Sequence, residues 1–402
     1  METIELRPRT LVAGGDAIAK DSEGRVVFVS GALPGELVSA EITVTKKDFR
    51  RAQVVEVLEP HASRQSPPCP LVRAGCGGCD LQHATPDLQR ELKRDIVVDA
   101  LMRIGHVADP IVNLGPLLDA HAYRTTMRFA VDSDGWLNMH RSNSTDLVRV
   151  KTCHVAHPLI NSLVDNICVP GGKEVVLRAA VHTSETMIVV DEQSNKKFIH
   201  EHIHGVKLRI SAASFFQGRP DGAEALIDAV HAALTGAPSG PRLDAYGGVG
   251  MFSAVLSARY PEHLGPWTIV ESSKAAIADA KENVPNAYHI NSDMAKWQPR
   301  KMAAVVADPS RTGLGKPGVN VIVQTRAAVI ALVSCDAASL GRDARLLTEA
   351  GYTFEYATVI DMFPHTSHVE VVSRFVRNPE SIVGSPESPA TAVGSSDGAM
   401  AP

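Results

Sequence analysis

The sequence predicts a multidomain α/β protein with three folded parts and a tail. Residues 1–60 alternate short apolar strands with glycine and proline turns, residues 61–210 are again rich in strand patterns, and residues 211–378 alternate strands with helices. Alternating strands and helices are typical of an open, mostly parallel, Rossmann-like sheet with helices on both faces. The 402 residues, 44% hydrophobic and 21% charged, fit a globular chain of two or three domains.

Composition excludes several classes of protein. No apolar run approaches the roughly 20 residues of a membrane helix, and the N-terminus lacks the apolar core of a signal peptide. Six cysteines are too few for a secreted disulfide framework in this length, so metal binding or catalysis is the expected use. We therefore expect a cytoplasmic protein without a membrane partner, and nothing points to an obligate protein partner. The net charge of −5 requires any nucleic acid to be held by local patches.

The first 60 residues are expected to form a small OB-like β-barrel. Alternating apolar positions such as Val27 and Val29 indicate half-buried strands, and Gly31, Pro34 and Gly35 interrupt them. A basic cluster lies between two of these strands and consists of Lys46, Lys47, Arg50 and Arg51. OB-like barrels grip phosphate backbones with such loops, although a solvated hairpin tip explains the same pattern.

The middle region begins with a group of cysteines. Cys69, Cys76 and Cys79 lie in "CPLVRAGCGGC", and Cys153 follows much later. Three clustered thiols with one remote thiol suit either an iron-sulfur cluster or a tetrahedral zinc ion. Cys168 has no partner in the sequence and is expected in the core.

Local patterns predict the main helices and strands. A helix is expected from about Pro86 to Ile104, directly after the cysteine turn. Further helices are expected at Gly222–Leu234, Met251–Ala258 and Lys274–Asn283, with strands at Arg242–Tyr246 and Trp267–Glu271 and near Tyr288, Ala304 and Ala331. Residues 379–402 are rich in serine, proline and glycine, which predicts a disordered tail.

A glycine-rich turn follows a strand in "RLDAYGGVGMFSAVLS". Such a turn lets the backbone approach a ligand at a helix N-terminus, and Glu271, at the end of the next strand, can bind both ribose hydroxyls. The third glycine of a dinucleotide fingerprint is absent, which weakens a nicotinamide interpretation. The form suits S-adenosylmethionine, and a plain strand-turn-helix is the alternative.

Three more residues have positions that suit chemistry. Asp308 closes a strand in "VVADPSRTGLG", where a carboxylate points into a ligand crevice, although a plain Asp-Pro turn is the alternative. Cys335 lies where an apolar strand ends and an amphipathic helix begins, so the helix N-terminus is expected to lower its pKa for use as a nucleophile. Glu370, between Val369 and Val371, is expected to have a raised pKa that suits a general base, unless it faces solvent from an edge strand.

Three histidines alternate in "FIHEHIHGV". His200, His202 and His204 would share one face of a strand and could bind a metal there. No carboxylate or cysteine motif supports a metal site, so a solvated strand face is the preferred interpretation.

Taken in order, these motifs resemble those of the bacterial RNA (uracil-5-)-methyltransferases that carry a TRAM domain and an iron-sulfur cluster. The resemblance runs from about Glu5 to Arg377 and includes "SFFQ", "DAYGGVG", "DPSRTG", "VSCDAASLGRD" and "DMFPHTSHVE". It implies a TRAM barrel that binds RNA, a class I methyltransferase domain at residues 211–378, and formation of 5-methyluridine in 23S ribosomal RNA. Transfer RNA is the alternative substrate.

The resemblance also implies a role for each site residue. Cys335 would add to C6 of uracil, and Glu370 would remove the proton from C5 after methylation. Gln217, Tyr246, Glu271 and Asn291 would hold S-adenosylmethionine, with Asp293 as a substitute for Asn291; Asp308 would lie between cofactor and uracil; Phe215 would stack on the flipped base; and Cys69, Cys76, Cys79 and Cys153 would hold a four-iron four-sulfur cluster. The helix at residues 86–104 would pack on the methyltransferase domain.

Four residues depart from the family pattern. Asp336 and Ala337 replace the usual Asn-Pro after the cysteine, Ser310 replaces Pro or Ala, and Met251 replaces a polar residue. A carboxylate beside Cys335 would oppose formation of the thiolate. These departures leave open an RNA-binding relative that has lost turnover, and a zinc-stabilised methyltransferase for another substrate is a third interpretation.

Overall fold

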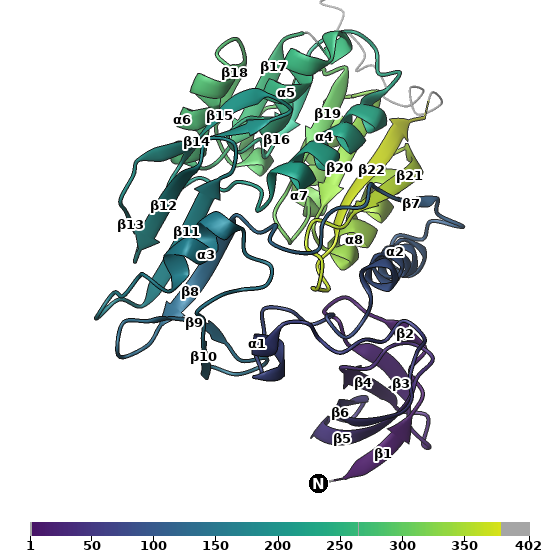
Figure 1. Ribbon diagram of the computed structural model, residues 1–402. Coiled ribbons are helices and arrows are strands. Elements are labelled where there is room, and N and C mark those ends of the chain that lie inside the picture. The colour runs from purple at the N-terminus through teal and green to yellow at the C-terminus, as the bar shows by residue number, and fades with distance from the viewer. Residues whose placement is uncertain (1, 264, 379–402) are drawn as a thin grey trace, which may run out of the picture.

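The computed structural model describes residues 2–263 and 265–378. Its N-terminal barrel lies at one end of the molecule, the C-terminal α/β domain at the other, and the middle region beside both (Figure 1). The tail expected at residues 379–402 lies outside the described residues. Within the described part of the chain, every helix is too short or too polar to cross a membrane.

The N-terminal barrel is a six-stranded sheet in the order β1-β5-β6-β4-β3-β2. Its strands are β1 (Thr3–Leu6), β2 (Thr10–Leu11), β3 (Ala17–Lys20), β4 (Val26–Ser30), β5 (Leu37–Thr45) and β6 (Phe49–Glu59). The predicted alternation is confirmed, because Val27 and Val29 are fully buried. All neighbouring strands run antiparallel except β4 and β6, which pair in parallel.

Two helices connect the barrel to the rest of the chain. The short α1 (Pro70–Arg73) lies among the cysteines, and α2 (Pro86–Arg103) begins with proline at its first position, where a missing N–H costs nothing. The apolar face of α2, which includes Leu92, Ile96 and Leu101, shares one hydrophobic core with the barrel and the C-terminal domain. In that domain it contacts α8 (Ala337–Glu349) and β7 (Val112–Leu114), so α2 joins the two ends of the molecule.

The middle region is built on a six-stranded antiparallel sheet in the order β10-β9-β8-β11-β12-β13. Its elements are β8 (Thr126–Val131), β9 (Leu137–His140), β10 (Leu147–Arg149), α3 (Pro158–Val164), β11 (Glu174–Ala180), β12 (Glu185–Val190) and β13 (Gln193–Ser194). A separate hairpin of β14 (Phe198–Ile203) and β15 (Val206–Ser211) follows, and its apolar side packs with helices of the C-terminal domain.

The C-terminal domain contains an eight-stranded sheet in the order β18-β17-β16-β19-β20-β22-β21-β7. Its strands after β7 are β16 (Arg242–Ala245), β17 (Trp267–Glu271), β18 (Tyr288–Asn291), β19 (Ala304–Ala307), β20 (Val329–Ser334), β21 (Tyr352–Ile360) and β22 (Glu370–Arg377). Its helices before α8 are α4 (Pro220–Leu234), α5 (Met251–Arg259), η1 (Pro261–His263), α6 (Lys274–Asn283), η2 (Met294–Lys296) and α7 (Gly315–Gln324). Strands β18, β17, β16, β19 and β20 run parallel, and β22 is antiparallel to β20.

The structure confirms the predicted alternation of strands and helices, and β17 and α6 have the predicted bounds. The prediction for Cys168 is wrong, because its side chain is exposed. It lies in the loop between α3 and β11, where its thiol donates a hydrogen bond to the carbonyl of Asp134 (3.3 Å). A lone cysteine in a loop has no apolar neighbours of fixed period, so the sequence offered no test of its burial.

Candidate active site and cysteine cluster

Five predicted site residues end parallel strands or directly follow them. Tyr246 follows β16, Glu271 ends β17, Asn291 ends β18, Asp308 follows β19 and Cys335 follows β20. Because the carboxyl ends of parallel strands meet at one edge of a sheet, these residues line that single edge. The structure therefore brings together the candidate cofactor residues and the candidate nucleophile from five separate segments.

The glycine-rich turn after β16 is held by Glu271. The Glu271 carboxylate accepts hydrogen bonds from the backbone N–H groups of Gly248 (3.1 Å) and Ser273 (2.6 Å). Gly248 has a φ of 54°, which glycine adopts without strain. A Cβ atom at Gly247 would lie 2.8 Å from Cγ2 of Ile269, so the turn packs tightly against β17.

Asn291, Asp293 and Gln217, three further candidate cofactor residues, differ in their hydrogen bonds and burial. Asn291 pairs with Glu271 in the β17–β18 register, and its amide donates to the carbonyls of Glu271 and Ser272 (2.9 Å each). Asp293 caps η2 by accepting from the N–H of Ala295 (2.9 Å). Gln217 is buried and lines a small cavity, and no hydrogen bond among the described residues joins it to Glu271.

Cys335 and Glu370 are neighbours across the sheet. Ser334, the last residue of β20, pairs with Val371, so Cys335, which follows β20, lies beside Glu370, the first residue of β22. Burial raises the pKa of Glu370 well above its usual range, the charge of Asp308 raises it further, and Arg311 opposes both. Burial raises the pKa of Asp308 to about 7, with a smaller contribution from Asp244. Cys335, Glu370 and Asp308 therefore lie close enough for the charge of Asp308 to affect Glu370 and for the charges of both carboxylates to affect Cys335.

Two expectations about this cluster are settled. The alternative that Glu370 faces solvent is wrong, because this residue is only 7% exposed. The prediction of a lowered pKa for Cys335 is also wrong, because the pKa is raised to about 11. Burial is the largest cause, the charges of Glu370 and Asp308 act in the same direction, and Arg311 opposes them. The N-terminus of α8 does not compensate for burial and two carboxylates.

Two of the four departures from the family pattern have clear structural roles. Asp336 is the N-cap of α8 and accepts a hydrogen bond from the N–H of Ser339 (2.7 Å). Aspartate and asparagine are equally good in that position, so this exchange keeps the helix start that Cys335 precedes. Met251 is buried and packs in the hydrophobic core between the sheet and its helices.

Asp343 is a site-supporting residue that sequence reasoning missed. From α8, its buried carboxylate accepts hydrogen bonds from the N–H groups of Leu314 (2.6 Å) and Gly315 (2.9 Å). It therefore fixes the segment that begins at Asp308. The only signal in the sequence was an acidic residue among the apolar positions of an amphipathic helix.

Phe215 is displayed on a fixed backbone. Its ring is 72% exposed, whereas Ser214 and Phe216 on either side are buried. The Ser214 hydroxyl donates to the buried carboxylate of Asp279 (2.7 Å), and the guanidinium of Arg178 donates to the Ser214 carbonyl (3.0 Å). An exposed aromatic ring on an anchored segment can stack on a planar ligand at a low entropic cost.

The four cysteines at positions 69, 76, 79 and 153 are gathered into one cluster. The pKa of Cys79 is raised to about 12, mainly by burial and also by the charges of Cys153, Cys76 and Cys69, while a hydrogen bond from Gln82 acts in the opposite direction. Burial likewise raises the pKa of Cys153, with contributions from Cys69 and Cys76. Segments more than 70 residues apart in the chain therefore place their thiols within electrostatic reach.

The basic cluster of the barrel is only partly free. Lys46 and Lys47 are exposed in the turn between β5 and β6, while Arg50 pairs with Glu2 (3.0 Å) and Arg51 with Asp16 (2.7 Å). Arg51 also lines a cleft of about 810 Å³ between the barrel, the cysteine loop and the middle sheet. Further basic residues that line this cleft are Arg128, Arg141 and Lys173.

Two of the three alternating histidines are paired with carboxylates. His200 lies 3.5 Å from Glu185, and His204, in the turn after β14, lies 2.9 Å from Asp228. Among the described residues, the groups of His, Cys, Asp and Glu whose ligand atoms all lie within 4.8 Å of one another include none of His200, His202 and His204.

The comparisons with known proteins agree with this architecture. A TRAM domain model matches residues 5–55. A Streptomyces avermitilis protein named as an uncharacterised RNA methyltransferase is 31% identical, over 92% of this chain and 98% of its own. The 23S rRNA (uracil(1939)-C(5))-methyltransferase of Shewanella halifaxensis is 28% identical, over 88% and 91%.

A solved structure covers nearly the whole chain. The tRNA (uracil-54, C5)-methyltransferase of Pyrococcus abyssi, in complex with S-adenosyl-L-homocysteine, has a TM-score of 0.72 and 22% identity, over 92% of this chain and 99% of its own. The fold is thus an N-terminal TRAM barrel with a C-terminal class I methyltransferase domain. The chain belongs to the family of RNA methyltransferases that its Streptomyces relative represents.

Proposed function

We propose that the chain uses S-adenosylmethionine to form 5-methyluridine in RNA, and that its substrate is 23S ribosomal RNA. The observation that carries the proposal is the meeting of Cys335, Glu370 and Asp308 at the carboxyl edge of the parallel sheet. A thiol beside two carboxylates with raised proton affinity suits covalent catalysis with proton removal from carbon. The Shewanella relative supports uracil in 23S rRNA as the substrate, and transfer RNA is the alternative that the Pyrococcus structure suggests.

Cys335 would act first. Its thiol, protonated at neutral pH because of its raised pKa, loses the proton to Asp308 as sulfur bonds to C6 of uracil. The electrons of the C5–C6 double bond would then form an enolate at the uracil. S-adenosylmethionine, when bound, would supply the methyl group to C5 and leave as S-adenosylhomocysteine. Glu370 removes the remaining C5 proton and the double bond re-forms. The C6–S bond breaks with its electrons on sulfur, and Cys335 takes its proton back from Asp308.

The residues around the glycine-rich turn would hold S-adenosylmethionine. Glu271 is oriented by its bonds to Gly248 and Ser273 and would bind the ribose hydroxyls. Asn291 and Asp293 follow the neighbouring strand, and Tyr246 and Gln217 complete the expected set. The core position of Met251 and the cap formed by Asp336 support an active enzyme over an RNA-binding relative without turnover.

The four gathered cysteines would hold a four-iron four-sulfur cluster. A single tetrahedral zinc holds its sulfur ligands about 3.8 Å apart, given Zn–S bonds of about 2.3 Å. Among the described residues, the groups whose ligand atoms all lie within 4.8 Å include none of these cysteines, which favours a larger cluster. Gln82 fits the site, because its Oε1 accepts from the N–H of Cys69 (3.1 Å) and its side chain lowers the pKa of Cys79 by hydrogen bonding to that sulfur.

The RNA would be held by the barrel and by Phe215. The target uridine must leave the RNA stack to reach Cys335, and the exposed ring of Phe215 would stack on it. Lys46, Lys47 and Arg51 would contact the phosphate backbone.

The test is transfer of labelled methyl groups to RNA from cells that lack the protein, followed by nucleoside analysis. Ribosomal and transfer RNA are assayed separately. Cys335→Ala should abolish 5-methyluridine formation, whereas Cys168→Ala, a matched change at an exposed cysteine, should not. Retained methylation in Cys335→Ala refutes the covalent mechanism. No product in either RNA with the native chain favours the RNA-binding relative.

A second experiment separates the two steps. Native protein should form a stable adduct with RNA that contains 5-fluorouridine, because fluorine cannot leave as a proton. Glu370→Gln should form adducts with ordinary RNA, and the rate of adduct release should be lower than in the native chain by a factor of about 10² or more. Rapid turnover in Glu370→Gln excludes Glu370 as the base.

A further inference from the structure

The segment between β21 and β22 leads directly into Glu370 and is held from outside the C-terminal domain. Asp80, the residue after Cys79, accepts two hydrogen bonds from Ser367: one from its N–H (2.7 Å) and one from its hydroxyl (2.7 Å). The backbone N–H groups of Asp80 and Leu81 both donate to the carbonyl of His365 (3.0 Å each). The cysteine loop therefore grips residues 365 and 367, a few residues before the candidate base.

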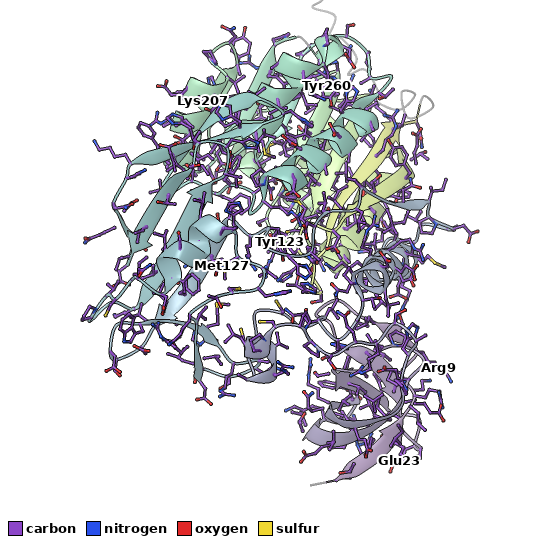
Figure 2. All side chains as sticks on the ribbon, in the orientation of Figure 1. Arg9, Glu23, Tyr123, Met127, Lys207 and Tyr260 are labelled. Atoms are coloured by element: carbon purple, nitrogen blue, oxygen red, sulfur yellow. The ribbon has the colours of Figure 1, made fainter. Side chains whose placement is uncertain are left out.

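Helix α2 and the middle region hold the earlier part of the same segment. Gln89 accepts a hydrogen bond from the N–H of His365 (2.6 Å), and Lys93 pairs with Asp361 (2.6 Å). The Tyr123 hydroxyl donates to the carbonyl of Pro364 (3.0 Å). Tyr123 lies near the centre of the molecule, between the C-terminal domain and the cysteine loop (Figure 2).

The barrel reaches the same point. A Cβ atom at Gly15, between β2 and β3, would lie 2.8 Å from Oδ2 of Asp80 and 3.2 Å from Cβ of Ser367. Gly15 also has a φ of 85°, which favours glycine. All three parts of the chain thus converge on the Asp80–Ser367 pair.

We propose that Asp80 is a positioning residue for Glu370, and that through Asp80 the cysteine loop sets the geometry of proton removal from C5. This inference rests on the proposed role of Glu370 as the base. Glu370 is the first residue of β22, so its backbone is fixed by the sheet on one side only and by the gripped segment on the other. A displacement of about 1 Å at a reacting group lowers a rate by up to about 10².

Loss of the Asp80 carboxylate should slow proton removal from C5 but leave adduct formation by Cys335 nearly unchanged. With RNA tritiated at C5 of uridine, Asp80→Ala should release tritium at least about tenfold more slowly than the native chain. Its trapping by 5-fluorouridine RNA should stay within about threefold, because adduct formation does not require removal of a C5 proton. A role confined to folding or RNA binding would lower both readouts together.

Two further variants sharpen the test. Asp80→Asn should keep tritium release within about threefold, since its Oδ1 can accept from the Ser367 N–H and its Nδ2 can donate to the hydroxyl oxygen. Asp87→Ala, a matched change at an exposed carboxylate in the first turn of α2, should leave both readouts unchanged.

The possible results of these experiments distinguish a positioning role of Asp80 from a structural one. Native tritium release in Asp80→Ala, or an equal loss of release and trapping, overturns the inference. If Asp80→Ala does not fold, Ser367→Ala removes only the hydroxyl bond, and it must show the same separation in weaker form. If the native chain neither releases tritium nor is trapped by 5-fluorouridine RNA, the proposed function itself is refuted. Glu370→Gln shows how much tritium release is lost when the base is absent.

Discussion

The buried ion pair between α2 and the segment before Glu370 allows a quantitative test of the interface. Lys93 is 0% exposed and Asp361 is 5% exposed, and Nζ lies 2.6 Å from Oδ1. Nζ also donates to the carbonyl of Phe363 (2.9 Å). Lys93→Met keeps the aliphatic stem but leaves the Asp361 carboxylate buried without its partner, which should lower the free energy of unfolding by about 3–5 kcal/mol.

The assay is urea unfolding followed by tryptophan fluorescence. Asp361→Asn in the Lys93→Met background removes the uncompensated charge and should recover most of the loss, because exchanging both members of a buried pair is often neutral. The double-mutant cycle then gives a coupling of several kcal/mol. A loss below about 1 kcal/mol for Lys93→Met, or no recovery in the double variant, would refute the reasoning.

Three other changes have definite expected results. Phe215→Ala should weaken RNA binding by about 1–3 kcal/mol in a titration with unchanged thermal stability, because the ring is 72% exposed. Burial raises the pKa of Asp244 from 3.8 to about 7, so the folded state holds a proton that the unfolded state releases, and stability falls as pH rises through that interval. Asp244→Asn should thus exceed the native chain in urea resistance at pH 8 and match it near pH 4; the reverse order contradicts the assignment. Gly247→Ala should weaken S-adenosylmethionine binding in calorimetry, because its Cβ would lie 2.8 Å from Ile269.

Local signals were sufficient for much of the fold. Helix α6 has the predicted bounds because Ser273 caps it by accepting from the N–H of Ala276 (3.3 Å), and an N-cap serine is readable in sequence. Strand β17 likewise shows as an apolar run that ends at an acid. These features depend on neighbours within about four residues, which is the range over which periodicity and capping act.

Local signals failed where burial depended on distant segments. Cys168 was predicted to lie in the core because an unpaired cysteine behaves as a small apolar residue, yet it is exposed in a loop. The pKa of Cys335 was expected to fall at a helix N-terminus and instead rises to about 11, first because of burial and then because of Glu370, 35 positions away in the numbering. Asp343 and Asp80 were not recognised, since each acts on a backbone that only the folded chain brings near.

The sequence by itself determined the order of the three parts, the alternation of strands and helices, and the residue types at the strand ends. Those features follow from composition, periodicity and motif order along the chain. Only the tertiary structure decided that Glu370 is buried beside Cys335, because the β20–β22 register joins segments with no local link. Tertiary structure likewise decided that Asp80 and Lys93 hold the approach to Glu370, since hydrogen bonds and ion pairs over more than 260 positions depend on packing.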